Sequence, residues 1–138
     1  MSDLNKIALK ILSNGKGILA ADESNGTMAK RLEAVNIPST PENRLLFRKT
    51  LFSSKSMKDC IGGVILYDET INQSLSSDKT IPNMISKSDT VPGIKVDTGA
   101  KVLANSPEEK ITEGLDGLRE RLKKYYKLGA RFTKWRGV

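Results

Sequence analysis

Two cations near the end of the sequence have a spacing that suits anion binding. Lys134 and Arg136 lie two residues apart in the stretch ARFTKWRGV. If this stretch is a β-strand, residues two apart project from the same face, and the two side chains point the same way. Arginine offers a planar fork that matches phosphate, and lysine can also give and take a proton. The sequence therefore predicts a face that binds an anion.

Other apolar runs also carry charged residues at or near their C-terminal ends. Asp22 ends GILAAD, Lys95 and Asp97 alternate in VPGIKVDTG, and Asp68 and Glu69 follow IGGVIL. In parallel α/β folds, ligands bind at the carboxyl ends of the strands. For Asp68 and Glu69 we favour the alternative that they are polar loop residues. Lys95 and Lys134 each lie within a predicted strand among apolar residues. Partial loss of hydration there suits a lysine to moving protons or binding phosphate.

The elements that must position these residues alternate between strands and helices. Short apolar runs predict strands over residues 17–22, 61–71, 91–99 and 130–138. Helical spacing and N-cap signals predict helices over residues 27–35, 40–53 and most of 106–129, after a short amphipathic helix at the start. The strands are apolar rather than strictly alternating, which favours an α/β fold with parallel strands.

The composition excludes several classes of site. The chain of 138 residues has no histidine, so imidazole zinc sites and Ser-His triads are excluded within it. The single cysteine, Cys60, cannot form an internal disulfide, suits a reducing compartment and is expected to be a buried, inert thiol. No apolar run approaches the length of a membrane span, and the first residues lack the features of a secretory signal, so we expect no membrane association.

The basic charge leaves two classes of partner open. The 23 basic and 16 acidic residues give a net charge of +7, which fits either nucleic acid or an anionic small molecule. Basic residues are spread among acidic ones, as in ERLKKYYK, and neither a helix-turn-helix pattern nor an RNA-binding aromatic signature is present. We therefore expect no nucleic-acid partner.

Several stretches, in their order along the chain, resemble one enzyme family. These are KGILAADESNGTMAKRL, ENR, GGVILYDETI, PGIKVDTG and FTKWRGV, of which ILAADES and KWR are the most specific. Together they resemble the N-terminal portion of class I fructose-bisphosphate aldolases, from about Ile7 to the last residue. The resemblance implies a (β/α)8 TIM barrel in a cytoplasmic, usually tetrameric enzyme of glycolysis and gluconeogenesis. It also implies reversible cleavage of fructose 1,6-bisphosphate to dihydroxyacetone phosphate and glyceraldehyde 3-phosphate through a lysine Schiff base, without metal or other cofactor.

The resemblance also implies catalytic roles for four residues. Asp22 matches the strand-one aspartate that positions and balances the catalytic lysines. Lys95 matches the strand-three lysine that helps hold the substrate's hydroxyls. Lys134 matches the strand-four lysine that contacts substrate and assists proton transfer, and Arg136 matches the adjacent arginine.

Four further residues match positions that the family associates with substrate binding. Arg31 and Arg44 match positions associated with substrate phosphate. Ser24 and Thr27 lie where hydroxyls near that phosphate are expected. From the residues alone, both arginines would be solvated side chains on helices.

The sequence departs from the family in length. The family's Schiff-base lysine lies on the sixth strand and its glutamate acid/base on the fifth, and neither region is present. We expect residues 1–138 to be the N-terminal part of a single barrel domain with four of the eight strands, and to be inactive alone. We favour a portion of a full-length aldolase, because no turn, cap or polar tail follows WRGV. The alternative is a non-catalytic half barrel that binds sugar phosphates or self-associates.

Overall fold

The computed structural model describes residues 2–76 and 79–138, and its centre is a sheet of four parallel strands. The strand order is β1 (Gly17–Ala21), β2 (Ile61–Leu66), β5 (Val91–Lys95) and β8 (Phe132–Lys134). The longer helices between the strands are α2 (Asn25–Glu33), α3 (Pro41–Phe52), α6 (Ile81–Lys87) and α7 (Leu118–Leu128). The predicted α/β fold with parallel strands is confirmed.

The remaining elements are short or lie beside the sheet. Helix α1 (Asp3–Leu12) and a 3₁₀ turn (Ser13–Gly15) precede β1. Two single-turn helices flank β2: α4 (Met57–Cys60) and α5 (Asp68–Ile71). Two antiparallel pairs complete the fold, β3 (Ser74–Ser76) with β4 (Lys79–Thr80), and β6 (Gly99–Leu103) with β7 (Ser106–Glu113). Within the described residues, no helix is both long and apolar enough to cross a membrane.

The hydrophobic core lies between one face of the sheet and the helices that cover it. Alternate strand residues supply its sheet side: Ala21, Val64, Leu66 and Ile94. The helices contribute the other side, through Phe52, Ile71, Ile81, Ile85 and Tyr125. All nine are at most 3% exposed, so this layer holds the sheet in place by hydrophobic burial.

The opposite face of the sheet carries the residues predicted to do chemistry. Gly93 pairs in register with Phe132, and the next residues on that face, Lys95 and Lys134, also pair in register. A Cβ atom on Gly93 would lie 2.4 Å from Cζ of Phe132, so only glycine leaves room for the ring. The small residue on β5 thus lets the aromatic ring lie across the sheet, one layer below the two lysines.

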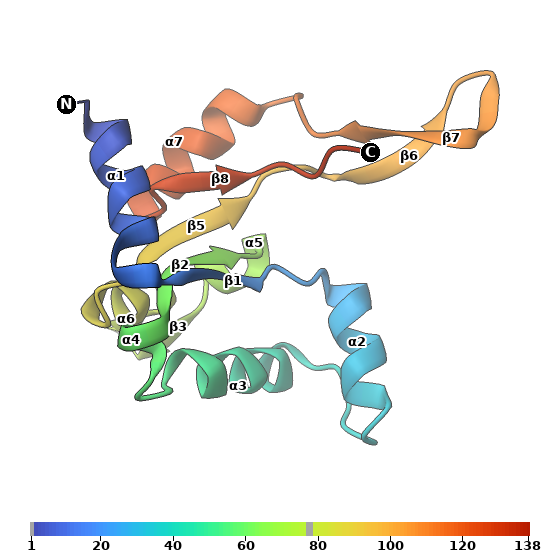
Figure 1. The fold of residues 1–138 in the computed structure, drawn as a ribbon. Helices are drawn as coiled ribbons and strands as arrows, with labels where there is room; N and C mark the ends of the chain where they lie inside the picture. The colour runs from blue at the N-terminus through green and yellow to red at the C-terminus, as the bar shows by residue number, and fades with distance from the viewer. Residues whose placement is uncertain (1, 77–78) are drawn as a thin grey trace.

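The helix predicted over most of residues 106–129 is wrong in its first part, because residues 106–113 form strand β7. Asn105, with φ of 61°, makes the turn between β6 and β7. Gly114 and Gly117 then adopt φ values of 136° and 64°, which a right-handed helix cannot contain. Helix α7 therefore begins only at Leu118. Figure 1 shows the β6–β7 hairpin projecting beyond the carboxyl ends of the parallel strands, across from α2.

Three other expectations need correction. The second predicted strand ends at Leu66, and Asp68 begins α5 because its backbone turns to helix after Tyr67. The last strand ends at Lys134, so Arg136 lies in an irregular segment. Cys60 is exposed rather than buried, since it is the last residue of the short helix α4, before β2 enters the sheet.

Candidate active site

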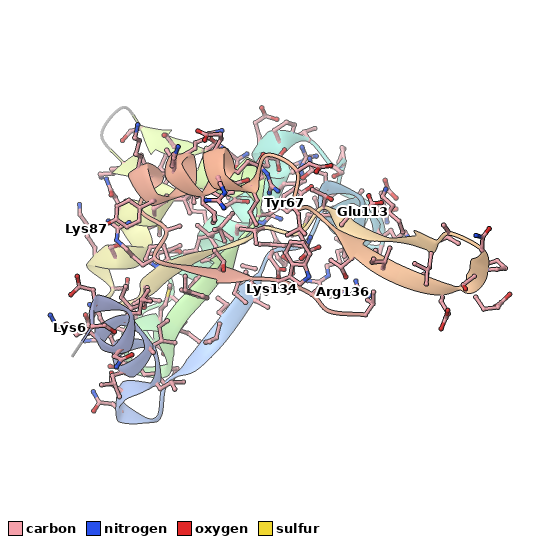
Figure 2. All side chains as sticks on the ribbon, turned by 90° about the horizontal axis from the view of Figure 1, so that it is seen from above. Lys6, Tyr67, Lys87, Glu113, Lys134 and Arg136 are labelled. Atoms are coloured by element: carbon pink, nitrogen blue, oxygen red, sulfur yellow. The ribbon has the colours of Figure 1, made fainter. Side chains whose placement is uncertain are left out.

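A cavity of about 460 Å³ lies at the carboxyl ends of the parallel strands. Its wall contains seven of the eight predicted site residues: Asp22, Ser24, Thr27, Arg31, Lys95, Lys134 and Arg136. Glu23, Tyr67, Asp97, Thr98, Gly99 and Ala20 complete the lining. In Figure 2 the labels of Tyr67, Lys134 and Arg136 gather at this end of the molecule, far from Lys6 and Lys87 at the other.

Lys134 and Asp22 join the two edges of the sheet. The Nζ atom of Lys134, at the end of β8, donates to Oδ2 of Asp22, just past β1, at 2.6 Å. In a flat sheet of four strands, the two edge strands would be about 14 Å apart, given about 4.8 Å per pair. The contact therefore reflects a sheet that curls toward this face, as barrel strands do. Both side chains are partly buried, at 32% and 12% exposed, so the pair is oriented rather than freely solvated.

Lys95 is held by Asp97, two residues further along the chain. Its Nζ atom donates to Oδ1 of Asp97 at 2.5 Å and to the Asp97 carbonyl at 2.9 Å. The Asp97 carboxylate also accepts the backbone N–H groups of Gly99 and Arg136. Burial alone would raise the pKa of Asp97, but these hydrogen bonds hold it below its usual value. Asp97 thus holds Lys95, the start of the hairpin and the backbone of Arg136 together.

The lowered pKa of Asp97 makes a prediction about acid stability. Because its folded pKa lies below the unfolded value of about 3.9, Asp97 stabilises the fold above that pH, and this contribution is lost as the pH falls through the folded pKa. Asp97→Asn should be destabilising by about 1–3 kcal/mol at pH 7. The gap to the wild-type chain should narrow between pH 5 and pH 3, measured by urea denaturation at each pH. The exposed Asp116→Asn serves as control, and a gap independent of pH would contradict the assignment.

Arg31 projects into the cavity from α2, whose N-terminus is capped beside it. The Oγ atom of Ser24 accepts the backbone N–H of Thr27 at 3.3 Å and lies 3.1 Å from the Thr27 hydroxyl. This N-cap fixes the start of α2, where helix dipoles favour anions. The guanidinium of Arg31 is paired with the Glu23 carboxylate, and its side chain is 54% exposed. The Arg31 side chain is therefore accessible to a ligand from solvent.

Arg44 is the one predicted residue that does not line the cavity. Its Nε and Nη2 atoms donate to both oxygens of Glu69, at 2.9 and 2.5 Å, and Nη1 donates to the Ser39 carbonyl at 2.6 Å. Hydrogen bonds from Arg44 lower the pKa of Glu69 below its usual range. The guanidinium is 9% exposed and its donors are engaged within the protein, so the structure gives Arg44 a contact with α5 rather than a place in the cavity wall.

Asp68 and Glu69 were interpreted as polar loop residues, but they lie in the short helix α5. Glu69 is 19% exposed and pairs with an arginine of α3, while Asp68 accepts the hydroxyl of Tyr125 at 2.8 Å. Burial, together with this bond to Asp68, raises the pKa of Tyr125 to about 12. Both acids therefore tie α5 to longer helices, in ways that short sequence patterns do not show.

Sequence reasoning noticed Asp97 but did not place it in the site. Its position two residues after Lys95 puts both on one face of an extended segment, which was a usable signal. Glu23 and Tyr67 also line the cavity. Glu23 directly follows Asp22, and Tyr67 directly follows strand β2. Thr98 and Gly99 line the cavity because the β6–β7 hairpin begins there. The hairpin was not predicted, since residues 106–113 were assigned to a helix. In the described part of the chain, no group of three or more histidine, cysteine, aspartate or glutamate residues has a metal-binding arrangement.

Comparison with known proteins identifies the family of the chain. The family model for class I fructose-bisphosphate aldolase matches residues 3–138. The chain belongs to the class I fructose-bisphosphate aldolase family. A probable class 1 fructose-bisphosphate aldolase of Xylella fastidiosa (strain Temecula1) is 49% identical over 138 residues, which is 100% of this chain and 41% of that protein. A non-muscle fructose-bisphosphate aldolase of Lethenteron camtschaticum is 50% identical, over 99% of this chain and 38% of the relative.

A solved aldolase structure shows the same arrangement of the chain. The Plasmodium falciparum fructose-bisphosphate aldolase, crystallised with TRAP and a small-molecule inhibitor, superposes with a TM-score of 0.93 at 46% identity. The match covers 98% of this chain and 39% of that one. The chain thus spans about 40% of the length of the aldolases it matches, and its fold is the four-stranded N-terminal part of the aldolase TIM barrel.

Proposed function

We propose that residues 1–138 supply part of the active site of a fructose-bisphosphate aldolase. The observation that carries this proposal is the Lys134–Asp22 pair beside Lys95 at the carboxyl ends of parallel strands, in a chain of the aldolase family. The reaction is the reversible cleavage of fructose 1,6-bisphosphate to dihydroxyacetone phosphate and glyceraldehyde 3-phosphate. The electron sink is a lysine Schiff base formed outside these residues, so the chain alone should be inactive.

The cavity residues divide this work according to their chemistry. Lys134, oriented by Asp22, meets the reacting part of the substrate and transfers protons. Lys95, fixed by Asp97, and Arg136 hold hydroxyl and charged groups near it. Arg31 receives a phosphate group at the capped start of α2, with the hydroxyls of Ser24 and Thr27 beside it.

Arg44 calls for a narrower role. Sequence analysis expected it to bind phosphate, but all three of its nitrogens donate within the protein. We propose that Arg44 supports the site by anchoring α3 to α5.

The wider setting of the activity is also a proposal. Family membership supports a single barrel domain, a sugar phosphate substrate, a cytoplasmic enzyme of glycolysis and a homo-oligomer, with a tetramer as the expected form. Cations directed into a cavity favour a small anionic substrate over nucleic acid.

A chimaeric enzyme tests the proposed function. Residues 1–138 replace the matching segment of the Xylella fastidiosa relative, which is 49% identical to them. We expect the chimaera to cleave fructose 1,6-bisphosphate and the 138-residue chain alone to show no cleavage, both followed by an assay of triose phosphate release. A chimaera that melts cooperatively but has no turnover would contradict the proposal. If such a chimaera still bound the substrate, the alternative of a non-catalytic sugar phosphate binder would be supported.

A further inference from the structure

Behind the cavity wall lies a buried arginine whose hydrogen-bonding capacity is only partly used. Arg48 of α3 is 0% exposed. Its Nη2 atom donates to the backbone carbonyl of Glu23 at 2.5 Å, and Nη1 lies 3.7 Å from Oε2 of Glu69. Its Nε and Nη1 atoms have no hydrogen-bond partner among residues 2–76 and 79–138. Buried guanidinium donors without partners are costly, so their presence calls for an explanation.

Glu23, whose backbone carbonyl contacts Arg48, carries the complementary group, a carboxylate with an unused oxygen. The Glu23 side chain is 12% exposed, and its carboxylate is divided between two environments. One oxygen, Oε1, pairs with Arg31 in the cavity, while Oε2 is buried and finds no hydrogen-bond partner in the described part of the chain. The hydrogen bond from Arg48 to the Glu23 backbone already holds the two residues together. The unused Oε2 acceptor of Glu23 and the unused Nε and Nη1 donors of Arg48 therefore belong to residues in contact.

We propose that Glu23 exchanges partners when a phosphate group binds, releasing Arg31 to the phosphate and turning to Arg48. This inference rests on the proposed function, because it assumes that Arg31 receives a phosphate ester. Arg48 is then a positioning residue, which acts on the ligand only through Glu23 and Arg31.

The balance of charge favours this exchange. With Arg31 engaged by the ligand, two buried or nearly buried arginines, Arg44 and Arg48, remain with two carboxylates, Glu23 and Glu69. The cluster carries one net positive charge with Arg31 and is therefore neutral after Arg31 leaves. Without Arg48, the largely buried Glu23 carboxylate would lose the cation behind the wall and would retain Arg31. The pair that must break is half exposed on the arginine side, where ion pairs contribute little.

Four forms of the full 138-residue chain test the exchange: wild type, Arg48→Met, Glu23→Gln and the double variant. The probes are fructose 1,6-bisphosphate and inorganic phosphate, titrated by calorimetry. We expect Arg48→Met to weaken binding of the sugar bisphosphate about tenfold or more, and Glu23→Gln to bind at least as tightly as wild type. The double variant should bind within about threefold of Glu23→Gln, because no carboxylate remains to retain Arg31. Lys49→Met, an exposed cation on the same helix, is the matched control.

Nitrogen-15 NMR of the arginine Nε–H groups in the wild-type chain provides a second measurement, which does not depend on how well Arg48→Met folds. We expect the Arg31 and Arg48 signals to shift together, with one saturation curve, as fructose 1,6-bisphosphate is added.

The possible failures separate the two proposals. A shift of Arg31 without a shift of Arg48 would overturn the exchange and leave the proposed function intact. The same conclusion would follow if Arg48→Met bound as tightly as wild type, or if Glu23→Gln failed to restore binding to it. If wild type bound neither probe, the phosphate role of Arg31 would fall, and the exchange with it.

Discussion

Replacing Glu69 with methionine should destabilise the fold by about 3–5 kcal/mol. Glu69 accepts two hydrogen bonds from Arg44 and lies 3.7 Å from a nitrogen of Arg48, and these guanidiniums are 9% and 0% exposed. Methionine has a similar volume but no charge, so it would leave the buried side chains of Arg44 and Arg48 without the carboxylate that lies against both. Removal of one partner from a buried ion pair is costly because the remaining charge has lost its water.

Urea denaturation followed by circular dichroism measures this loss. The control is Glu120→Met on α7, where the ion pair with Lys123 is exposed on both sides and a change within about 0.5 kcal/mol is expected. Equal effects at positions 69 and 120 would show that the buried network contributes no more than a surface ion pair.

Lys134→Met should reduce the turnover number of the chimaeric aldolase by a factor of about 100 or more. The substitution keeps the length of the side chain but removes the amine that Asp22 orients at 2.6 Å. It therefore removes both a cation that lines the cavity and a group able to transfer a proton. Turnover is measured by release of triose phosphate, and binding by calorimetry with fructose 1,6-bisphosphate.

A matched substitution separates this local effect from a loss of positive charge in general. Lys101→Met removes one charge from the exposed surface of the β6–β7 hairpin and should leave turnover close to that of the unmodified chimaera. If the variant at position 134 kept normal turnover, the catalytic role proposed for that lysine would be wrong.

The sequence was most informative where the chain forms the central sheet. Apolar runs located β1, β2, β5 and β8, because a strand covered by helices must be apolar over its whole length. Polar residues at the ends of these runs meet at one edge of a parallel sheet, and Lys95 and Lys134 do lie in register there. Local pattern and global fold agree in this region.

The sequence was less informative where long-range contacts decide the structure. Residues 106–113 carry a helix N-cap signal, yet they pair with β6, and the pairing outweighs the local preference. The roles of Glu69 and Arg44 were missed for a related reason. Glu69 and Arg44 are partners 25 residues apart, and spacing along the chain does not show that two helices will bring them together.

The contact between Lys134 and Asp22 also constrains the order in which the molecule folds. The two residues are 112 positions apart, so their pairing closes a loop that contains the first three strands and the helices between them. Closing a loop of that length costs entropy, which only the intervening strands and helices can offset beforehand. The cavity therefore cannot form in a nascent chain that contains only β1, β2 and β5. Its opposite walls meet only when the fourth strand, β8, has joined the sheet.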